Sequence, residues 1–135
     1  MVSQLFEYTE AYIGTLDSLA KQLYKEFGNS LDSPRYLNRL GGIHYRKDKM
    51  DKAIVIYKLN VQLFPEDGNS WDSLGDTYFK ANNMQKASEA YSKALELKPI
   101  DTDCFWCDNA SEKLQQIKNK QDGKNKIKDN IRKTL

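Results

Sequence analysis

The sequence predicts an all-α fold, in which helix pairs repeat along the chain to form an α-α superhelix with two clear repeats plus flanking helices. Apolar residues recur at steps of three and four over most of the 135 residues, which is the spacing of one helix face. Residues of matching type return 34 positions later. Two of the three prolines, Pro65 and Pro99, are also 34 positions apart and mark the ends of successive helix pairs.

The first segment, residues 1–33, is predicted to form one long amphipathic helix or two shorter ones. Its apolar residues keep steps of three and four throughout, and Gly14 lies where such a helix would bend. Residues 28–30 read Gly-Asn-Ser, which is typical of a helix C-terminus. Extending the repeat frame backwards gives Ala20 and Tyr24 the positions of a small and an aromatic residue. The second half of this segment is therefore a candidate for the back helix of a degenerate repeat.

Residues 34–67 and 68–101 are predicted to be two full repeats, each a helix-turn-helix unit. Ser33 and Pro34 supply an N-cap and a first-turn proline for the first unit. That unit agrees with the second at six of eight pattern positions, with His44 replacing an aromatic residue and Asn60 replacing a small one. In the second repeat the pattern residues are Trp71, Leu74, Gly75, Tyr78, Ala87, Tyr91, Ala94 and Pro99.

The glycines of this pattern lie inside helices, where glycine costs about 1 kcal/mol relative to alanine. A helix tolerates that cost where a neighbouring helix must approach closely. Gly41 and Gly75 are therefore expected at close helix contacts, with Ala53 and Ala87 as the small residues of the second helices.

Two further segments follow the repeats. Residues 102–120 are predicted to form a C-terminal capping helix that opens near Asp101, because a strict 34-residue frame would place polar residues at its core positions. Residues 121–135 form a basic tail with few apolar residues, for which we expect disorder or a loosely held helix.

The eight-position pattern resembles the tetratricopeptide repeat, strongly in the second repeat and moderately in the first. The resemblance implies a stack of helix pairs with a concave groove that holds other proteins. In that family, defined positions of the first helix of each repeat face the groove. Carried onto this chain, the implied peptide- or partner-binding residues are Arg35, Asn38, Arg39, Tyr45, Arg46, Asn69, Asp72, Asp76, Phe79 and Lys80, with Gly42 and Ser73 at the remaining groove positions.

One rim of this predicted groove is basic and the next is acidic, so we expect Arg39 to pair with Asp72 or Asp76. Members that bind chaperone tails hold a C-terminal carboxylate with a lysine and an asparagine at two fixed groove positions. Here those positions hold Asn38 and Gly42 in the first repeat and two acids in the second. The resemblance therefore argues against a co-chaperone of that type.

Tyr45 and Phe79 have two interpretations. They offer an apolar floor to a bound peptide or helix, or they serve ordinary packing between helices.

A second resemblance concerns context. The runs Tyr36–Gly42, Met50–Asn60 and Phe64–Gly75 resemble the C-terminal tail of certain bacterial esterases and other serine hydrolases. It implies an alternative function as the non-catalytic tail of an α/β-hydrolase-type esterase or related serine hydrolase, with residues 2–27 as the linker helix. It carries over no catalytic residue.

No catalytic residue, metal site or cofactor is predicted. Cys104 and Cys107 form a lone Cys-x-x-Cys, and the only histidine, His44, lies in another helix, so a four-ligand zinc site is not expected. We expect two reduced thiols packed at the capping helix. The sequence has no Gly-x-Ser-x-Gly motif and no phosphate-binding glycine loop. The chain is accordingly predicted not to be an enzyme.

Charge is distributed unevenly, with a net of +5 in residues 111–135 and −3 in the remainder. The basic segment lacks aromatic residues on which bases could stack, so no nucleic-acid partner is expected. No stretch approaches the roughly 20 apolar residues of a membrane span, and the start lacks the features of a signal peptide. These observations favour a cytoplasmic protein without a membrane partner, unless the sequence is a fragment of a longer secreted chain.

The predicted partner is a protein, bound as a peptide or a helix. Two repeats are few for a stable stack. A homo-oligomer or an upstream hydrolase domain is therefore expected to cover the open apolar edge.

Overall fold

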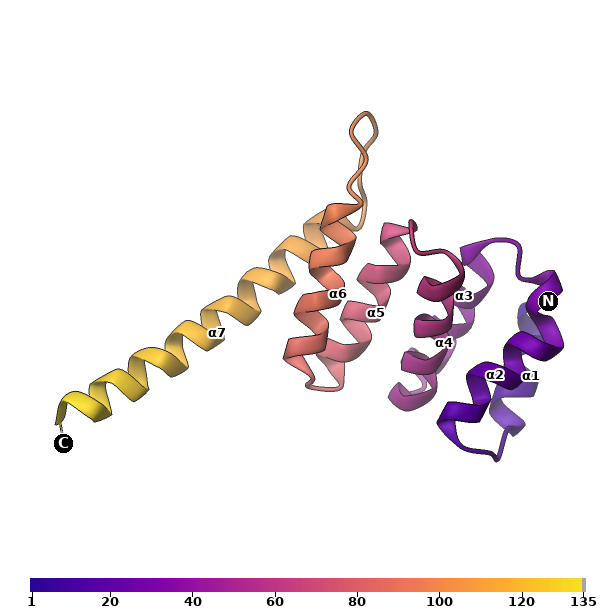
Figure 1. Ribbon diagram of the computed structural model, residues 1–135, viewed down its shortest axis with the longest axis horizontal. Helices are drawn as coiled ribbons and strands as arrows, with labels where there is room; N and C mark the ends of the chain where they lie inside the picture. Colours follow the sequence, from indigo (N-terminus) through magenta and orange to yellow (C-terminus); the bar gives the residue numbers. More distant parts are fainter. Residues whose placement is uncertain (135) are drawn as a thin grey trace.

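The computed structural model describes residues 1–134, which contain seven α-helices, one short 3₁₀ turn and no strand. Successive helices stack side by side in chain order, and the last helix projects away from the stack (Figure 1). The all-α helical-repeat prediction is therefore confirmed. The helices are α1 (Val2–Ala11), α2 (Leu16–Phe27), α3 (Pro34–Arg46), α4 (Met50–Leu63), α5 (Gly68–Lys80), α6 (Met84–Glu96) and α7 (Cys107–Thr134).

The two repeats are the helix pairs α3–α4 and α5–α6. The side chain of Ser33 accepts a hydrogen bond from the Arg35 amide at the start of α3, as the sequence predicts. Each pair turns through one residue with a left-handed backbone, Asp48 (φ 62°) in the first and Asn82 (φ 63°) in the second. Aspartate and asparagine tolerate this conformation better than most residues. The two turns lie 34 residues apart, so the period extends to the loops.

The repeat glycines make room for tyrosine rings of the second helix. A Cβ atom on Gly41 would lie 2.6 Å from the Tyr57 ring, and one on Gly75 would lie 2.7 Å from the Tyr91 ring. Both rings are buried. The close approach expected at these glycines is thus confirmed.

The N-terminal segment forms two helices, as one of the two alternatives predicted. Helix α1 ends at Ala11, and Thr15 caps α2 by accepting a hydrogen bond from the Ser18 amide, so residues 12–15, which include Gly14, separate the two helices. Helix α1 packs on α3 and α2 packs on α4, which continues the stacking of the repeats. Thr9 and His44, both fully buried, hydrogen-bond across the α1–α3 contact at 2.8 Å.

The C-terminal segment differs from the prediction in where its helix begins. Helix α7 begins at Cys107 instead of near Asp101, because residues 97–106 form a loop closed by a disulfide between Cys104 and Cys107. The helix continues to Thr134, which agrees with the second of the two alternatives for the tail, a helix instead of disorder. Lysine, the commonest residue there, has good helix propensity. Residues 118–134 are all exposed, and Leu135 lies outside the described residues.

Over residues 1–134 no helix is both long enough and apolar enough to cross a lipid bilayer.

Candidate functional site

A hollow of about 800 Å³ lies between the first helices of the two repeats. We call it the α3–α5 hollow. Its walls come from α3 and α5, with the start of α1 at one end and the Tyr57 hydroxyl of α4 below. Four of the predicted groove residues line it, namely Asn38, Arg39, Arg46 and Asn69. Tyr36, Ile43 and Ser73 also line it.

A buried polar cluster fixes one wall of the hollow. The Asn60 side-chain amide of α4 donates to Asn38 Oδ1 at 2.9 Å and to the Pro34 carbonyl oxygen at 2.9 Å. The Ser70 hydroxyl contacts the same Asn38 oxygen at 3.1 Å. Asn60 is fully buried, so the unusual residue of the first repeat orients a groove residue.

Two arginines give the hollow its positive charge. Arg39 and Arg46 are exposed, and no carboxylate is among the residues that line the hollow. Within residues 1–134 neither guanidinium forms an ion pair. Arg46 lies over Gly42, where an added Cβ atom would meet its Nη1 at 3.3 Å. The expected pairing of Arg39 with Asp72 or Asp76 is therefore wrong.

The Tyr57 hydroxyl adds a neutral donor to the floor of the hollow. It donates to the Asn38 carbonyl oxygen at 3.3 Å. Burial raises the pKa of Tyr57 to about 12, although the nearby Arg46 charge acts in the opposite direction. Tyr57 is thus un-ionised at neutral pH, and the floor does not cancel the charge of the arginines.

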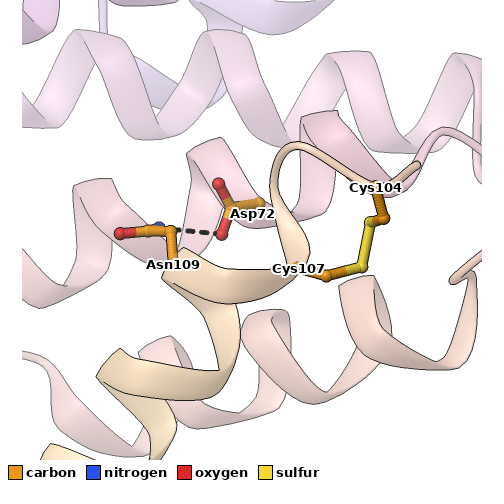
Figure 2. Close-up of a disulfide and its surroundings, with 4 residues drawn as sticks. All are labelled: Asp72, Cys104, Cys107 and Asn109. Atoms are coloured by element: carbon orange, nitrogen blue, oxygen red, sulfur yellow. Dashed lines mark hydrogen bonds between the residues drawn. A yellow bond between two sulfur atoms is a disulfide. The ribbon is translucent and has the colours of Figure 1, made fainter.

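The two acids of α5, Asp72 and Asp76, contact α7 instead of Arg39. The Asn109 amide donates to Asp72 Oδ1 and to Asp76 Oδ1, both at 2.9 Å, and Figure 2 shows the Asn109–Asp72 bond beside the disulfide. The Tyr91 hydroxyl also donates to Asp76 Oδ1, at 2.5 Å. Asp72 is only 7% exposed. Asn109 of α7 therefore takes the place beside Asp72 and Asp76 that the sequence analysis gave to Arg39.

The environment of Asp72 changes its ionisation. Burial raises its pKa to about 7, with a smaller contribution from the negative charge of Asp76. The hydrogen bond from Asn109 acts in the opposite direction by stabilising the carboxylate. Asp72 consequently titrates near neutral pH.

The other predicted groove residues lie outside the α3–α5 hollow. Arg35 folds back on its neighbour Tyr36, with its guanidinium carbon 5.0 Å from the ring centre. Tyr45 and Asp76 line a small adjoining hollow of about 100 Å³. Lys80 lies over the Tyr45 ring at 4.5 Å and forms an ion pair with Asp48 at 3.7 Å.

Phe79 packs partly buried against the core, and Lys113 of α7 lies 4.5 Å from its ring centre. Its surroundings favour the packing interpretation over that of a peptide floor.

His44 and the cysteines take structural positions. The Thr9 hydroxyl donates to the Leu5 carbonyl oxygen, so His44 Nε2 donates to Thr9, and burial lowers the pKa of His44. Cys104 and Cys107 form a disulfide, which corrects the expectation of two reduced thiols. Among residues 1–134 no cluster of three or more His, Cys, Asp or Glu could hold a metal ion.

Tyr36, Ile43 and the first residues of α1 belong to the hollow although the groove positions of the family did not include them. The amphipathic pattern of α1 signalled a packed helix, but it gave no register for its N-terminus beside α3.

Comparison with known proteins agrees with this architecture. A family model described as tetratricopeptide repeat matches residues 68–101. The chain contains a tetratricopeptide repeat. That match covers the predicted second repeat. The first repeat has the same close glycine–tyrosine contact, between Gly41 and Tyr57, as the second has between Gly75 and Tyr91.

Curated relatives also carry this repeat. The chain is 32% identical over 81 residues to the tetratricopeptide repeat domain-containing protein PYG7, chloroplastic, of Arabidopsis thaliana, covering 60% of this chain and 27% of that protein. It is 37% identical over 60 residues to the peroxisomal targeting signal receptor of Candida albicans, covering 44% of this chain and 10% of the receptor. The chain thus spans about a quarter or less of these relatives.

Solved structures show the same fold. The Sgt2 tetratricopeptide-repeat domain of Aspergillus fumigatus superposes with a TM-score of 0.61 at 19% identity, covering 93% of this chain and 82% of that one. MamA gives a TM-score of 0.52 at 22% identity, covering 93% and 81%. These relatives are eukaryotic where an organism is given, and none of these four supports the resemblance to bacterial hydrolase tails.

Proposed function

We propose that this chain is a non-catalytic protein-interaction module that binds an acidic, extended segment of a partner protein in the α3–α5 hollow. Tetratricopeptide-repeat relatives include a receptor named for a targeting signal, which makes peptide binding a natural function for the fold. The single observation that carries the choice of partner is the pair of arginines without a carboxylate.

Charge supports this choice. Arg39 and Arg46 lie one above the other, seven residues apart on α3, and both line the hollow. The nearby acids Asp72 and Asp76 are already hydrogen-bonded to Asn109. A bound carboxylate would therefore meet two guanidinium groups in a hollow that no carboxylate of residues 1–134 lines.

Pre-organisation supports it further. Asn38 is held by Asn60 and Ser70, so its orientation does not have to be fixed when a peptide binds. Asn69 and Ser73 add hydrogen-bonding groups from α5 on the opposite wall. An extended backbone lying between the two walls would find partners for its amide groups, and an acidic side chain would supply the specificity.

Selection from a displayed library of random peptides tests the proposal. Peptides that the wild-type chain enriches should be rich in Asp and Glu, and the best one serves as a fluorescent probe for affinity. Arg39→Gln and Arg46→Gln should each weaken its binding roughly tenfold, because a hydrogen bond to a charged group contributes about 1.5 kcal/mol. Lys118→Gln and Lys126→Gln, on the exposed part of α7, are matched controls and should leave the affinity unchanged.

The proposal is wrong if the enriched peptides carry no excess of acidic residues, or if the arginine variants bind them as tightly as the wild type does. Added salt should also weaken binding, since the contacts are at an exposed surface.

A further inference from the structure

A second surface lies on the other side of α5, between the back helices of the two repeats. Trp71, Leu74 and Tyr78 form its floor, and α4 and α6 form its walls, around a volume of about 520 Å³. We call it the α4–α6 groove. Its floor residues recur at steps of three and four, whereas Asn69 and Ser73, which line the α3–α5 hollow, lie on another face of α5. The two surfaces are therefore separate.

The α4–α6 groove combines an apolar floor with a basic rim. Lys58, Lys86 and Lys93 surround it, with one acid, Glu89, in its lining, and Lys93 also forms an ion pair with Glu96 at 3.4 Å. Lys86 lies 5.7 Å from the centre of the Tyr78 ring, which keeps its charge at the edge of the floor. Such a surface favours a ligand that presents apolar side chains next to carboxylates.

The chain itself carries a segment of that chemistry. The loop of residues 97–106 between α6 and α7 stands out from the helical stack (Figure 1). Its side chains Ile100 and Phe105 are 97% and 78% exposed, although isoleucine and phenylalanine are usually buried. The acids Asp101 and Asp103 lie between them and are exposed as well.

The base of this loop is held firmly, which fixes the direction of Phe105. The disulfide joins Cys104 to Cys107 on either side of Phe105 and Trp106, as Figure 2 shows for the two cysteines. Trp106 packs over Gly68, where an added Cβ atom would lie 2.7 Å from its ring. The Phe105 ring meets the Trp106 ring edge-on, with centres 5.2 Å apart. With Trp106 anchored on α5, Phe105 is directed outward before any partner arrives.

We propose that the loop of residues 97–106 in one copy of this chain docks into the α4–α6 groove of a second copy. Two exposed apolar side chains with two acids between them match an apolar floor bordered by three lysines, of which Lys58 and Lys86 form no ion pair within residues 1–134. A volume of about 520 Å³ lies within the range of pockets that enclose small ligands, roughly 300–1,000 Å³, and accommodates both side chains.

The loop does not fill the groove of its own chain, because Ile100 and Phe105 remain exposed there. Each copy carries one loop and one groove. The contact therefore joins different surfaces, and such contacts close into a ring or continue as a chain of copies. This contact leaves the α3–α5 hollow free. The proposed self-association is therefore independent of the proposed peptide binding.

Sedimentation velocity on the 135-residue chain, from micromolar to several hundred micromolar, tests the contact. The weight-average mass should rise above the 15.6 kDa monomer as concentration increases. The loop variant Ile100→Ser/Phe105→Ser and the groove variant Lys58→Glu/Lys86→Glu should each remain monomeric. All four positions are exposed, and circular dichroism verifies that both variants fold.

Mixing the two variants provides the decisive measurement. The loop variant keeps an intact groove and the groove variant keeps an intact loop, so an equimolar mixture should form a species of twice the monomer mass and nothing larger. Ile13→Ser, at a side chain that is 99% exposed in another loop, and Lys118→Glu/Lys126→Glu are controls that should assemble like the wild type.

A wild-type chain that stays monomeric at every concentration overturns the proposal, even if the loop proves to bind a different protein. Assembly that persists in both double variants overturns it as well, because another surface would then join the copies.

Discussion

The ionisation of Asp72 gives a prediction that can be worked out in detail. Its folded-state pKa of about 7 lies above the value of about 3.9 expected in the unfolded chain. The native state therefore binds a proton more tightly than the unfolded state does. This contribution to stability is fully present below about pH 4 and is lost as the pH rises through about 7.

The size of the effect follows from the two pKa values. A difference of about three pKa units corresponds to about 4 kcal/mol, since each unit is worth about 1.4 kcal/mol. Solvent screening and relaxation of the neighbouring side chains reduce this value, and we expect about 2 kcal/mol. Asp72→Asn removes the charge while keeping an oxygen that accepts the hydrogen bond from Asn109.

Urea unfolding of the wild type and of Asp72→Asn between about pH 5 and pH 8 measures the effect. The variant should be the more stable protein at about pH 8, and the difference should shrink towards pH 5. Burial lowers the pKa of His44, but His44 is present in both proteins and its contribution cancels from the comparison. Asp129→Asn, at an exposed position of α7, is the control. If the wild type and Asp72→Asn lose stability in parallel over this range, the assignment of a raised pKa to Asp72 is refuted.

Two further predictions concern packing and the disulfide. Gly75→Ala should destabilise the chain by about 1–2 kcal/mol in urea unfolding, because its Cβ atom would lie 2.7 Å from a fully buried tyrosine ring and overpacking outweighs the gain in helix propensity. Gly123→Ala, which meets no atom within 4 Å, should instead stabilise it by up to about 1 kcal/mol; an equal effect at both glycines would contradict the close-contact explanation. Reduction of the Cys104–Cys107 disulfide should speed chymotrypsin cleavage after Phe105 and lower stability by about 2 kcal/mol, which is the entropy of closing so short a loop. The double variant Cys104→Ser/Cys107→Ser should be cleaved quickly with or without reductant, and slow cleavage of it would show that the disulfide does not hold the loop.

The repeat architecture was predictable from the sequence because its determinants are local and periodic. Gly41 and Gly75 each sit 16 residues before a tyrosine ring, and this spacing alone fixes which helices touch. Asn60 was recognisable as unusual, but its contact with Asn38 depends on the exact position of α4 against α3.

The distribution of charge pairs was less predictable. Arg39 and Asp72 occupy predicted groove positions on the first helices of neighbouring repeats, and sequence reasoning paired them. The structure directs the acid to Asn109, a residue of α7 that follows no repeat pattern. No signal in the sequence specifies how such a helix docks. That Arg39 and Arg46 lack an acidic partner within residues 1–134 could therefore be learned only from the structure.

The C-terminal segment illustrates two further limits. The spacing of Cys104 and Cys107 fits reduced thiols as well as a disulfide, since oxidation is not encoded in the spacing. The polar composition after Ile117 fits disorder as well as an exposed helix, because it supplies helix propensity without a packing face.

Helix α7 extends well beyond the stack of helices. It contains 28 residues and is therefore about 42 Å long, but its last buried residue is Ile117. The part beyond Ile117 extends for about 25 Å without covering any surface of the stack. A fluorophore attached near Thr134 would be carried at that distance from the docked part of α7. Its energy transfer to a second dye at the α3–α5 hollow would then report whether the helix remains straight while a peptide binds.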